Sequence, residues 1–201
     1  MSLIIGIKKN NVVYLGADTQ ITGESRKIFP TQTNKNNFKI FKIKGLKNCF
    51  CGVTGSYANM SIIKALNFKK DITCDNMVIN YDFIVNTFIQ KIIGTLISYK
   101  KIDLLKGDDL DIDNAFLLAQ NDKLFFIGSD FSVIEVDSYF AIGSGSRDVQ
   151  SILYENYKKE TPEKNIYKAL DFSSKIDLFV SEPFIIVNTA ENKIKILANI
   201  K

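Results

Sequence analysis

The chain has 201 residues, of which 46% are hydrophobic and 24% charged, so its composition excludes a disordered chain and favours one compact domain over residues 1–201. Its net charge of +4, from 26 basic and 22 acidic residues, is too small and too dispersed to indicate nucleic-acid binding. The absence of histidine excludes Ser-His-Asp and Cys-His catalysis and any histidine-bearing metal site.

The expected location of the protein follows from its first residues and its cysteines. Residues 1–9 lack the basic start and full apolar core of a signal peptide, and no stretch approaches the roughly 20 apolar residues of a membrane span. Cys49 and Cys51 alternate with Phe50 in an apolar stretch, which predicts buried strand residues in a reducing compartment. We therefore expect a cytoplasmic protein without contact to membranes.

The first third of the sequence predicts strands. Residues 3–8 and 12–17 are β-rich runs separated by a tight turn at 9–11. Residues 38–43 partly alternate between lysines and hydrophobic residues, and residues 48–54 form a further apolar run. These four runs predict two consecutive hairpins.

Predicted helices and short strands then alternate along the chain. Ser56 is placed to cap a first helix, and residues 81–99 carry apolar side chains at three- and four-residue spacing. An acidic loop is expected over 103–114, followed by strands at 115–119, 123–127, 132–136 and 139–142. A helix through 149–157, a second one that starts at Thr161-Pro162, and strands at 184–188 and 193–198 complete the prediction.

This order of elements favours an α+β fold in which helices cover antiparallel sheets. Periodicity alone leaves several arrangements open, and two packed sheets between two helical layers is one of them.

Ser2 is the first candidate for chemistry. The initiator methionine is generally removed before a small residue, which exposes a hydroxyl and an α-amine on one residue. Because an α-amine has an ordinary pKa of about 7.7–8.0, it accepts a proton near neutral pH and serves as a base for its own hydroxyl. The simpler interpretation is an ordinary chain start before a strand.

Further candidates lie near the ends of predicted strands. Asp18 ends the second strand, and a hairpin returns it beside Ser2. Lys39 lies near the start of the third run, and Gly52 lies near the end of the fourth. A carboxylate keeps a neighbouring ammonium charged, and that ammonium lowers the pKa of a nearby hydroxyl. A glycine N–H can point at a developing oxyanion, although Lys39 also fits a solvated strand residue.

Six segments together resemble the β-type subunits of proteasomes, most closely the bacterial HslV-type peptidases, within the N-terminal-nucleophile hydrolases. They occur in the family's order and cover nearly the whole chain, although no single one is specific. They are residues 2–7 (SLIIGI), 16–23 (GADTQITG), 38–43 (FKIFKI), 51–55 (CGVTG), 141–146 (AIGSGS) and 168–171 (KALD). The resemblance implies a four-layer αββα sandwich.

The resemblance also implies catalytic roles for individual residues. Ser2 matches the N-terminal nucleophile, Lys39 matches the lysine beside it, and Asp18 matches the acidic residue that orients this lysine. Gly52 matches the glycine whose N–H binds the oxyanion of the substrate. The family usually begins with threonine, so the serine found here loses the methyl group that restricts χ1.

Three further matches lie around this set. Ser144 matches a serine that holds the α-amine, and Asp177 matches an aspartate near that serine. Thr22 matches a position whose backbone pairs with an extended substrate. Ser144 is otherwise a loop serine, and Asp177 is otherwise the end of a helix. No metal or organic cofactor is expected for this chemistry.

The implied function is hydrolysis of peptide bonds in unfolded proteins or peptides, inside homo-oligomeric rings that stack face to face. An ATP-dependent unfoldase is the implied partner, and no nucleic acid is involved. Two alternatives stay open: a non-catalytic ring subunit, expected if Met1 is retained, and another N-terminal-nucleophile enzyme such as an amidase or transpeptidase.

Overall fold

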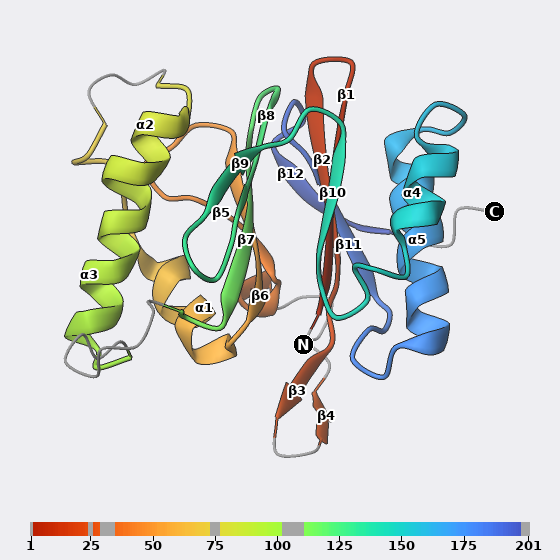
Figure 1. Cartoon of the computed structure of the whole chain (residues 1–201), viewed down its shortest axis with the longest axis horizontal. Helices are drawn as coiled ribbons and strands as arrows, with labels where there is room; N and C mark the ends of the chain where they lie inside the picture. The colour runs from red at the N-terminus through yellow and green to blue at the C-terminus, as the bar shows by residue number, and fades with distance from the viewer. Residues whose placement is uncertain (1, 24–25, 29–34, 73–76, 102–110, 198–201) are drawn as a thin grey trace.

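The computed structural model describes residues 2–23, 26–28, 35–72, 77–101 and 111–197. Two five-stranded antiparallel sheets lie face to face between two layers of helices (Figure 1). This is the four-layer αββα sandwich that the sequence resemblance implies. Within the described ranges, no helix combines the length and the apolar character needed to cross a membrane.

The first sheet has the strand order β10-β1-β2-β11-β12. Asn10 and Asn11, with φ of 54° and 59°, make the predicted tight turn between β1 and β2. Both strands lie inside the sheet with their two faces covered, which explains why they read as nearly continuous apolar runs. The strands are β1 Leu3–Lys9, β2 Val12–Asp18, β10 Tyr139–Gly143, β11 Phe184–Asn188 and β12 Lys193–Leu197.

The second sheet runs β5-β6-β7-β8-β9. Its strands are β5 Ile40–Lys42, β6 Cys49–Gly55, β7 Asn114–Gln120, β8 Lys123–Ile127 and β9 Val133–Glu135. Cys49 and Cys51 are buried thiols of β6, as predicted. The two predicted hairpins, β1–β2 and β5–β6, are both present, and each belongs to a different sheet.

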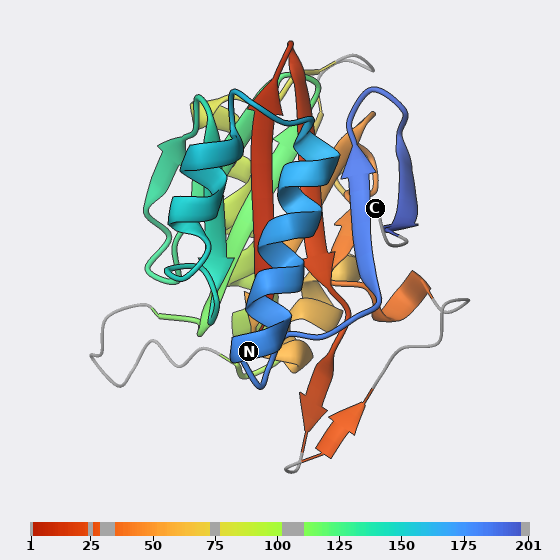
Figure 2. The ribbon, with the colours of Figure 1, turned by 90° about the vertical axis from the view of Figure 1, so that its right-hand side faces the viewer.

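Helices cover the outer face of each sheet, as Figure 2 shows for α4 and α5 over the first one. α1 Tyr57–Ala65, α2 Tyr81–Phe83, the π-helical segment η2 Ile84–Ile89 and α3 Gln90–Ser98 cover the second sheet, and α4 Gln150–Asn156 and α5 Pro162–Ile176 cover the first. Ser56 and Thr161 accept backbone N–H groups at the starts of α1 and α5, so both predicted caps are confirmed. The expected helix over 81–99 is helical over 81–98 but contains the π segment.

Three clusters of buried side chains join the layers. The cluster between the two sheets includes Ile4, Leu15, Ile40, Phe50 and Leu117. The cluster under α4 and α5 contains the alternate residues of β1, and the cluster under α1 and α3 contains the opposite face of the second sheet. Each sheet therefore contributes side chains to both of its faces.

Three parts of the structure differ from the sequence prediction. The predicted strand 38–43 is regular only over Ile40–Lys42. Asn114, expected in a loop, begins β7 and is buried, whereas residues 103–110 of that loop lie outside the described residues. A short hairpin of β3 Ile21–Gly23 and β4 Arg26–Ile28 was not expected; it projects from the end of the sandwich where the N-terminus lies (Figure 1).

Candidate active site

Ser2 is held at the start of β1 by contacts from two other strand ends. Its carbonyl accepts a hydrogen bond from the Ser144 N–H at 2.9 Å, and the Ser144 Oγ lies 3.4 Å from the same oxygen. On the next residue, the Leu3 N–H donates to Asp18 Oδ1 at 2.9 Å. Ser2 is only 5% exposed, so the residue just before β1 is buried and held in place.

Glycine is needed beside this residue. Gly143, at the end of β10, has φ of +101°, and a Cβ built on it would lie 1.9 Å from the Ser2 carbonyl oxygen. Any side chain at position 143 would therefore displace Ser2 and strain the backbone.

Asp18 and Lys39 form a buried ion pair next to Ser2. The Lys39 Nζ donates to Asp18 Oδ2 at 2.7 Å, and the two side chains are 4% and 0% exposed. The Gln20 N–H donates to the same carboxylate oxygen at 3.0 Å. The carboxylate thus binds the lysine and two backbone N–H groups, which satisfies a group that is costly to bury.

Burial shifts the pKa values of both partners toward their neutral forms. Desolvation raises the pKa of Asp18, and the attraction and hydrogen bond of Lys39 oppose this shift. Desolvation likewise lowers the pKa of Lys39, against the attraction of Asp18 and, more weakly, of Asp177. The lysine is therefore less basic than an exposed one and lies next to a hydroxyl.

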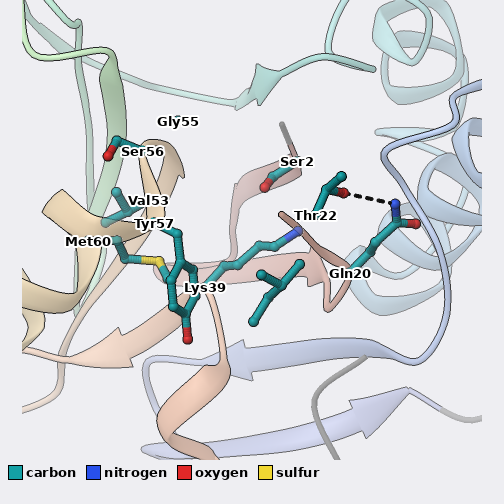
Figure 3. Close-up of a pocket in the computed structure, with 10 residues that line it drawn as sticks. Ser2, Gln20, Thr22, Lys39, Val53, Gly55, Ser56, Tyr57 and Met60 are labelled. Atoms are coloured by element: carbon teal, nitrogen blue, oxygen red, sulfur yellow. Dashed lines mark hydrogen bonds between the residues drawn. The ribbon is translucent and has the colours of Figure 1, made fainter. Parts of the chain in front are cut away.

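A cleft of about 230 Å³ opens beside these groups. Ser2, Thr22 and Lys39 are among the residues that line it. Figure 3 shows the Lys39 side chain ending near the Ser2 hydroxyl. The cleft thus brings a hydroxyl, an ammonium and the edge of β3 together at one place.

Ser2 and Gly55 also line a second cavity, of about 320 Å³. Its wall includes Ser144, Asp111 and Asp113. Asp111 Oδ2 accepts a hydrogen bond from the Ser129 hydroxyl, and its Oδ1 accepts the Asp113 N–H. Open space therefore adjoins Ser2 on two sides. This leaves room for an extended peptide on either side of the Ser2 hydroxyl.

The structure brings most of the predicted site residues together. Ser2, Asp18 and Lys39 are in contact or line the same cleft, and Thr22 lies on its wall. Ser144 contacts Ser2 as expected, but the contact is to the carbonyl of Ser2; the predicted bond to a freed α-amine stays a prediction.

Asp177 and Gly52 lie farther out. Asp177 follows the last residue of α5 and accepts the Phe179 N–H at 2.8 Å. It acts on Lys39 by electrostatic attraction. Gly52 lies inside β6 opposite Ile40, and a Cβ there would meet Ile4 at 2.8 Å. Gly52 is not among the described residues that line either cavity, so its predicted oxyanion role stays a prediction.

Sequence reasoning missed three residues of the site. Gln20 holds Asp18 through its N–H, and its side chain donates to Thr22 Oγ1 and to the Leu178 carbonyl. Gly55, with φ of +94°, and Tyr57 line the cleft. An aspartate side chain often accepts the backbone N–H of the residue two positions later. The Asp-x-Gln spacing was therefore the one sequence signal available for these contacts.

The arrangement suits nucleophilic attack by a hydroxyl. A buried cation beside a hydroxyl stabilises the negative charge that develops on oxygen during attack. Within the described ranges, no three carboxylate or thiol groups gather as metal ligands would.

Several solved structures share this fold. BPH of Thiobacillus denitrificans, solved in complex with epoxomicin, is 16% identical, with a TM-score of 0.73 over 92% of this chain and 97% of that one. HslV of Trypanosoma brucei is 19% identical, with a TM-score of 0.60 over 92% and 98%. Anbu, the ancestral beta-subunit from Yersinia bercovieri, is 16% identical, with a TM-score of 0.65 over 92% and 80%.

Sequence comparison alone finds no such relatives. No protein-family model matches this chain, and no curated protein matches it. The resemblance inferred from the six sequence segments is therefore confirmed at the level of the fold, which is that of a proteasome-type subunit.

Proposed function

We propose that the chain is a proteasome-type peptidase subunit that hydrolyses peptide bonds with Ser2 as its N-terminal nucleophile. The observation that carries this proposal is the buried Lys39–Asp18 pair, 2.7 Å apart, in the cleft that Ser2 lines. The fold shared with HslV and BPH supports it.

In the proposed reaction, the Ser2 oxygen attacks the carbonyl carbon of the scissile bond while the Ser2 α-amine takes the hydroxyl proton. The Lys39 ammonium stabilises the oxygen charge, and Asp18 keeps this lysine in place. A glycine N–H of β6 donates to the oxyanion: Gly52 is the donor implied by the resemblance, and Gly55 is the glycine on the cleft wall. The leaving amine takes up the proton, and water then hydrolyses the Ser2 ester.

The substrate backbone is proposed to add to β3. This strand pairs with β4 alone among the described strands, so its second edge is open to a peptide. Thr22 lies in the middle of β3 and on the cleft wall. An extended peptide paired there passes the Ser2 hydroxyl.

The test is peptide hydrolysis by the wild type and by Ser2→Ala. We expect the alanine variant to lose activity by roughly 10⁴-fold or more, because the nucleophile is gone. Ser2→Thr keeps the hydroxyl and should stay active, and Ser98→Ala, at the exposed end of α3, should equal the wild type. Unchanged activity in Ser2→Ala would refute the assignment.

A chemical test uses epoxomicin, which BPH binds. We expect intact mass to increase by one inhibitor molecule in the wild type and not in Ser2→Ala.

A product screen with an added amine acceptor separates hydrolysis from transpeptidation, since only the latter yields a new peptide bond.

We further propose that the subunit assembles into stacked homo-oligomeric rings in the cytoplasm and receives unfolded substrates from an ATP-dependent unfoldase. Light scattering of the purified protein tests the assembly: a strict monomer would contradict it. An inactive protein that still assembles would favour the non-catalytic ring subunit.

A further inference from the structure

The chain reaches Lys39 from a segment that belongs to neither five-stranded sheet. This segment is the single 3₁₀ turn η1 Lys35–Asn37 followed by Phe38, and the regular ladder of β5 begins only at Ile40. The carbonyl of Lys39 itself accepts the Val53 N–H from β6 at 3.0 Å. The position of Lys39 therefore depends on what holds the segment before it, as well as on β6.

Lys64, in the last turn of α1, holds this segment. Its ammonium donates to the Asn36 carbonyl at 2.6 Å and to the Phe38 carbonyl at 2.7 Å, and both acceptors come just before Lys39 in the chain. The same nitrogen lies 5.0 Å from the centre of the Phe41 ring, which follows Lys39. One side chain of α1 thus contacts the backbone before Lys39 and a ring after it.

The charge of Lys64 strengthens these contacts. A charged donor binds a backbone carbonyl more strongly than a neutral one does. The ammonium is nevertheless half-buried, and this burial lowers the pKa of Lys64 from 10.5 to about 8, with no carboxylate among the described residues opposing the shift. Lys64 therefore begins to lose its charge just above neutral pH.

The elements packed around Lys64 hold few other titratable groups. They are Tyr57 on α1, Lys35 in η1, Lys39 and Lys42 at β5, Cys49 and Cys51 on β6, and Lys91 on α3, which pairs with Asp71. Burial raises the pKa values of Tyr57 and of both thiols, so these groups stay neutral near pH 8. Burial lowers the pKa values of Lys64 and Lys39, so a test must distinguish these two lysines.

We infer that Lys64 is a positioning residue for the proposed nucleophilic site: its ammonium fixes residues 36–38 and through them places Lys39 beside Asp18 and Ser2. Lys64 is not among the described residues that line the cleft, so it acts through the chain and not on the substrate. This inference rests on the proposed function for the reaction that it serves, but the placement of Lys39 can be measured without turnover.

The kinetics of peptide hydrolysis at pH 7 provide the first test. Lys64→Met should lower kcat about tenfold and leave KM within about twofold of the wild type, because Lys39 shifts while the wall of the cleft stays. Lys64→Arg keeps a charged donor and should retain most of the wild-type kcat. Lys64→Gln keeps an uncharged donor and should lie between them, and it replaces Lys64→Met if thermal melting shows that variant to be unfolded.

Lys91 offers a matched control. Its ammonium also donates to a backbone carbonyl, that of Asn67 at 2.8 Å, and also lies 5.0 Å from a ring centre, that of Phe68. These contacts join α3 to residues 67–68 instead of the turn before Lys39. Lys91→Met should therefore leave kcat within about twofold of the wild type. An equal loss of kcat in Lys91→Met and Lys64→Met would overturn the inference.

The pH profile supplies a readout that a merely structural role would not move. Wild-type kcat should fall as pH rises through about 8, and in Lys64→Arg this fall should move to higher pH because a guanidinium stays charged. The pKa of Lys64 is lower in the folded chain than its ordinary 10.5, so its titration does not weaken the fold as pH rises from about 8 to 10.5. Relative to Lys64→Arg, the wild type should therefore lose no melting temperature between pH 7 and pH 9. The same kcat profile in both proteins would contradict the role of Lys64.

NMR of lysine labelled at Cε separates this inference from the proposed function. The Lys39 resonance should shift in Lys64→Met and return to its wild-type position in Lys64→Arg, whether or not the chain cleaves peptides. With these shifts but no hydrolysis by the wild type, the positioning role stands and the peptidase is refuted. Hydrolysis that requires Ser2, with equal kcat in Lys64→Met and the wild type, overturns the positioning role and leaves the peptidase intact.

Discussion

Two lysine–carboxylate pairs in this molecule have the same length and opposite surroundings. In both Lys39–Asp18 and Lys123–Glu135, the nitrogen and oxygen lie 2.7 Å apart. The side chains of the first pair are 4% and 0% exposed, and those of the second are 36% and 42% exposed. Equal geometry therefore does not mean equal energetics.

The surroundings of each pair decide what it contributes to stability. An exposed pair is screened by water and contributes little to stability. A buried pair loses the hydration of two charges, and its attraction repays that cost only in part, so an apolar pair of similar volume would often stabilise the fold better. We interpret the buried pair as one that serves the chemistry of Ser2 at the expense of stability.

The largest expected effect comes from breaking the buried pair. Lys39→Met leaves an unpaired carboxylate in the core and should reduce the free energy of unfolding by about 3–5 kcal/mol, measured by denaturant titration. The matched control, Lys123→Met, should leave the unfolding midpoint unchanged within error.

A double variant tests whether the lost stability comes from the unpaired charge. Lys39→Met combined with Asp18→Asn removes both charges and should regain most of the lost stability, while peptidase activity stays absent. A Lys39→Met loss no larger than that of Lys123→Met would show that the two pairs are equivalent.

A smaller effect is expected at Gly143, which lies against the Ser2 carbonyl. Gly143→Ala adds a Cβ against the Ser2 carbonyl at a left-handed φ, and it should destabilise by about 1–3 kcal/mol. Activity should fall more than stability explains, because Ser2 is displaced from Lys39. Gly94→Ala, at an exposed position of α3 with open space around it, should instead stabilise by about 0.5–1 kcal/mol. Equal, small effects at both glycines would argue against a fixed Ser2.

The smallest expected effect is a shift in the pKa of Lys39. Desolvation lowers the pKa of Lys39 from its ordinary 10.5, and the attraction of Asp18 opposes this shift. Asp18→Asn removes the opposing attraction, so the pKa of Lys39 should fall further and the lysine should be less protonated at a given pH. NMR of lysine labelled at Cε measures this directly in both proteins. A pKa of Lys39 that rises in Asp18→Asn would contradict the assigned pair.

The individual strands and helix starts were predictable because their causes are local. The strands β1 and β2 show as apolar runs, and Ser56 and Thr161 mark helix starts by their caps. The hairpin that returns Asp18 beside Ser2 follows from the turn at Asn10 and Asn11. Each of these signals comes from a few residues that are adjacent in the sequence.

The remaining features depend on tertiary packing. Lys39 reads as a residue on the solvated face of an alternating run, yet it is buried because β2 and β6 pack around the start of β5. The β3–β4 hairpin has only three residues per strand, too few for a period to show. The place of Tyr57 in the cleft depends on how α1 lies against Lys39, which no local pattern encodes.

Mass spectrometry of the intact, purified chain, with sequencing of its first residue, determines whether the nitrogen of Ser2 is a free α-amine. The buried pair serves an N-terminal nucleophile only if the nitrogen of Ser2 is a free amine. We predict a protein lighter by one methionine that begins at Ser2. A peptidase-active protein that still carries Met1 would contradict the account, because the nitrogen of its Ser2 would be an amide that cannot accept the proton.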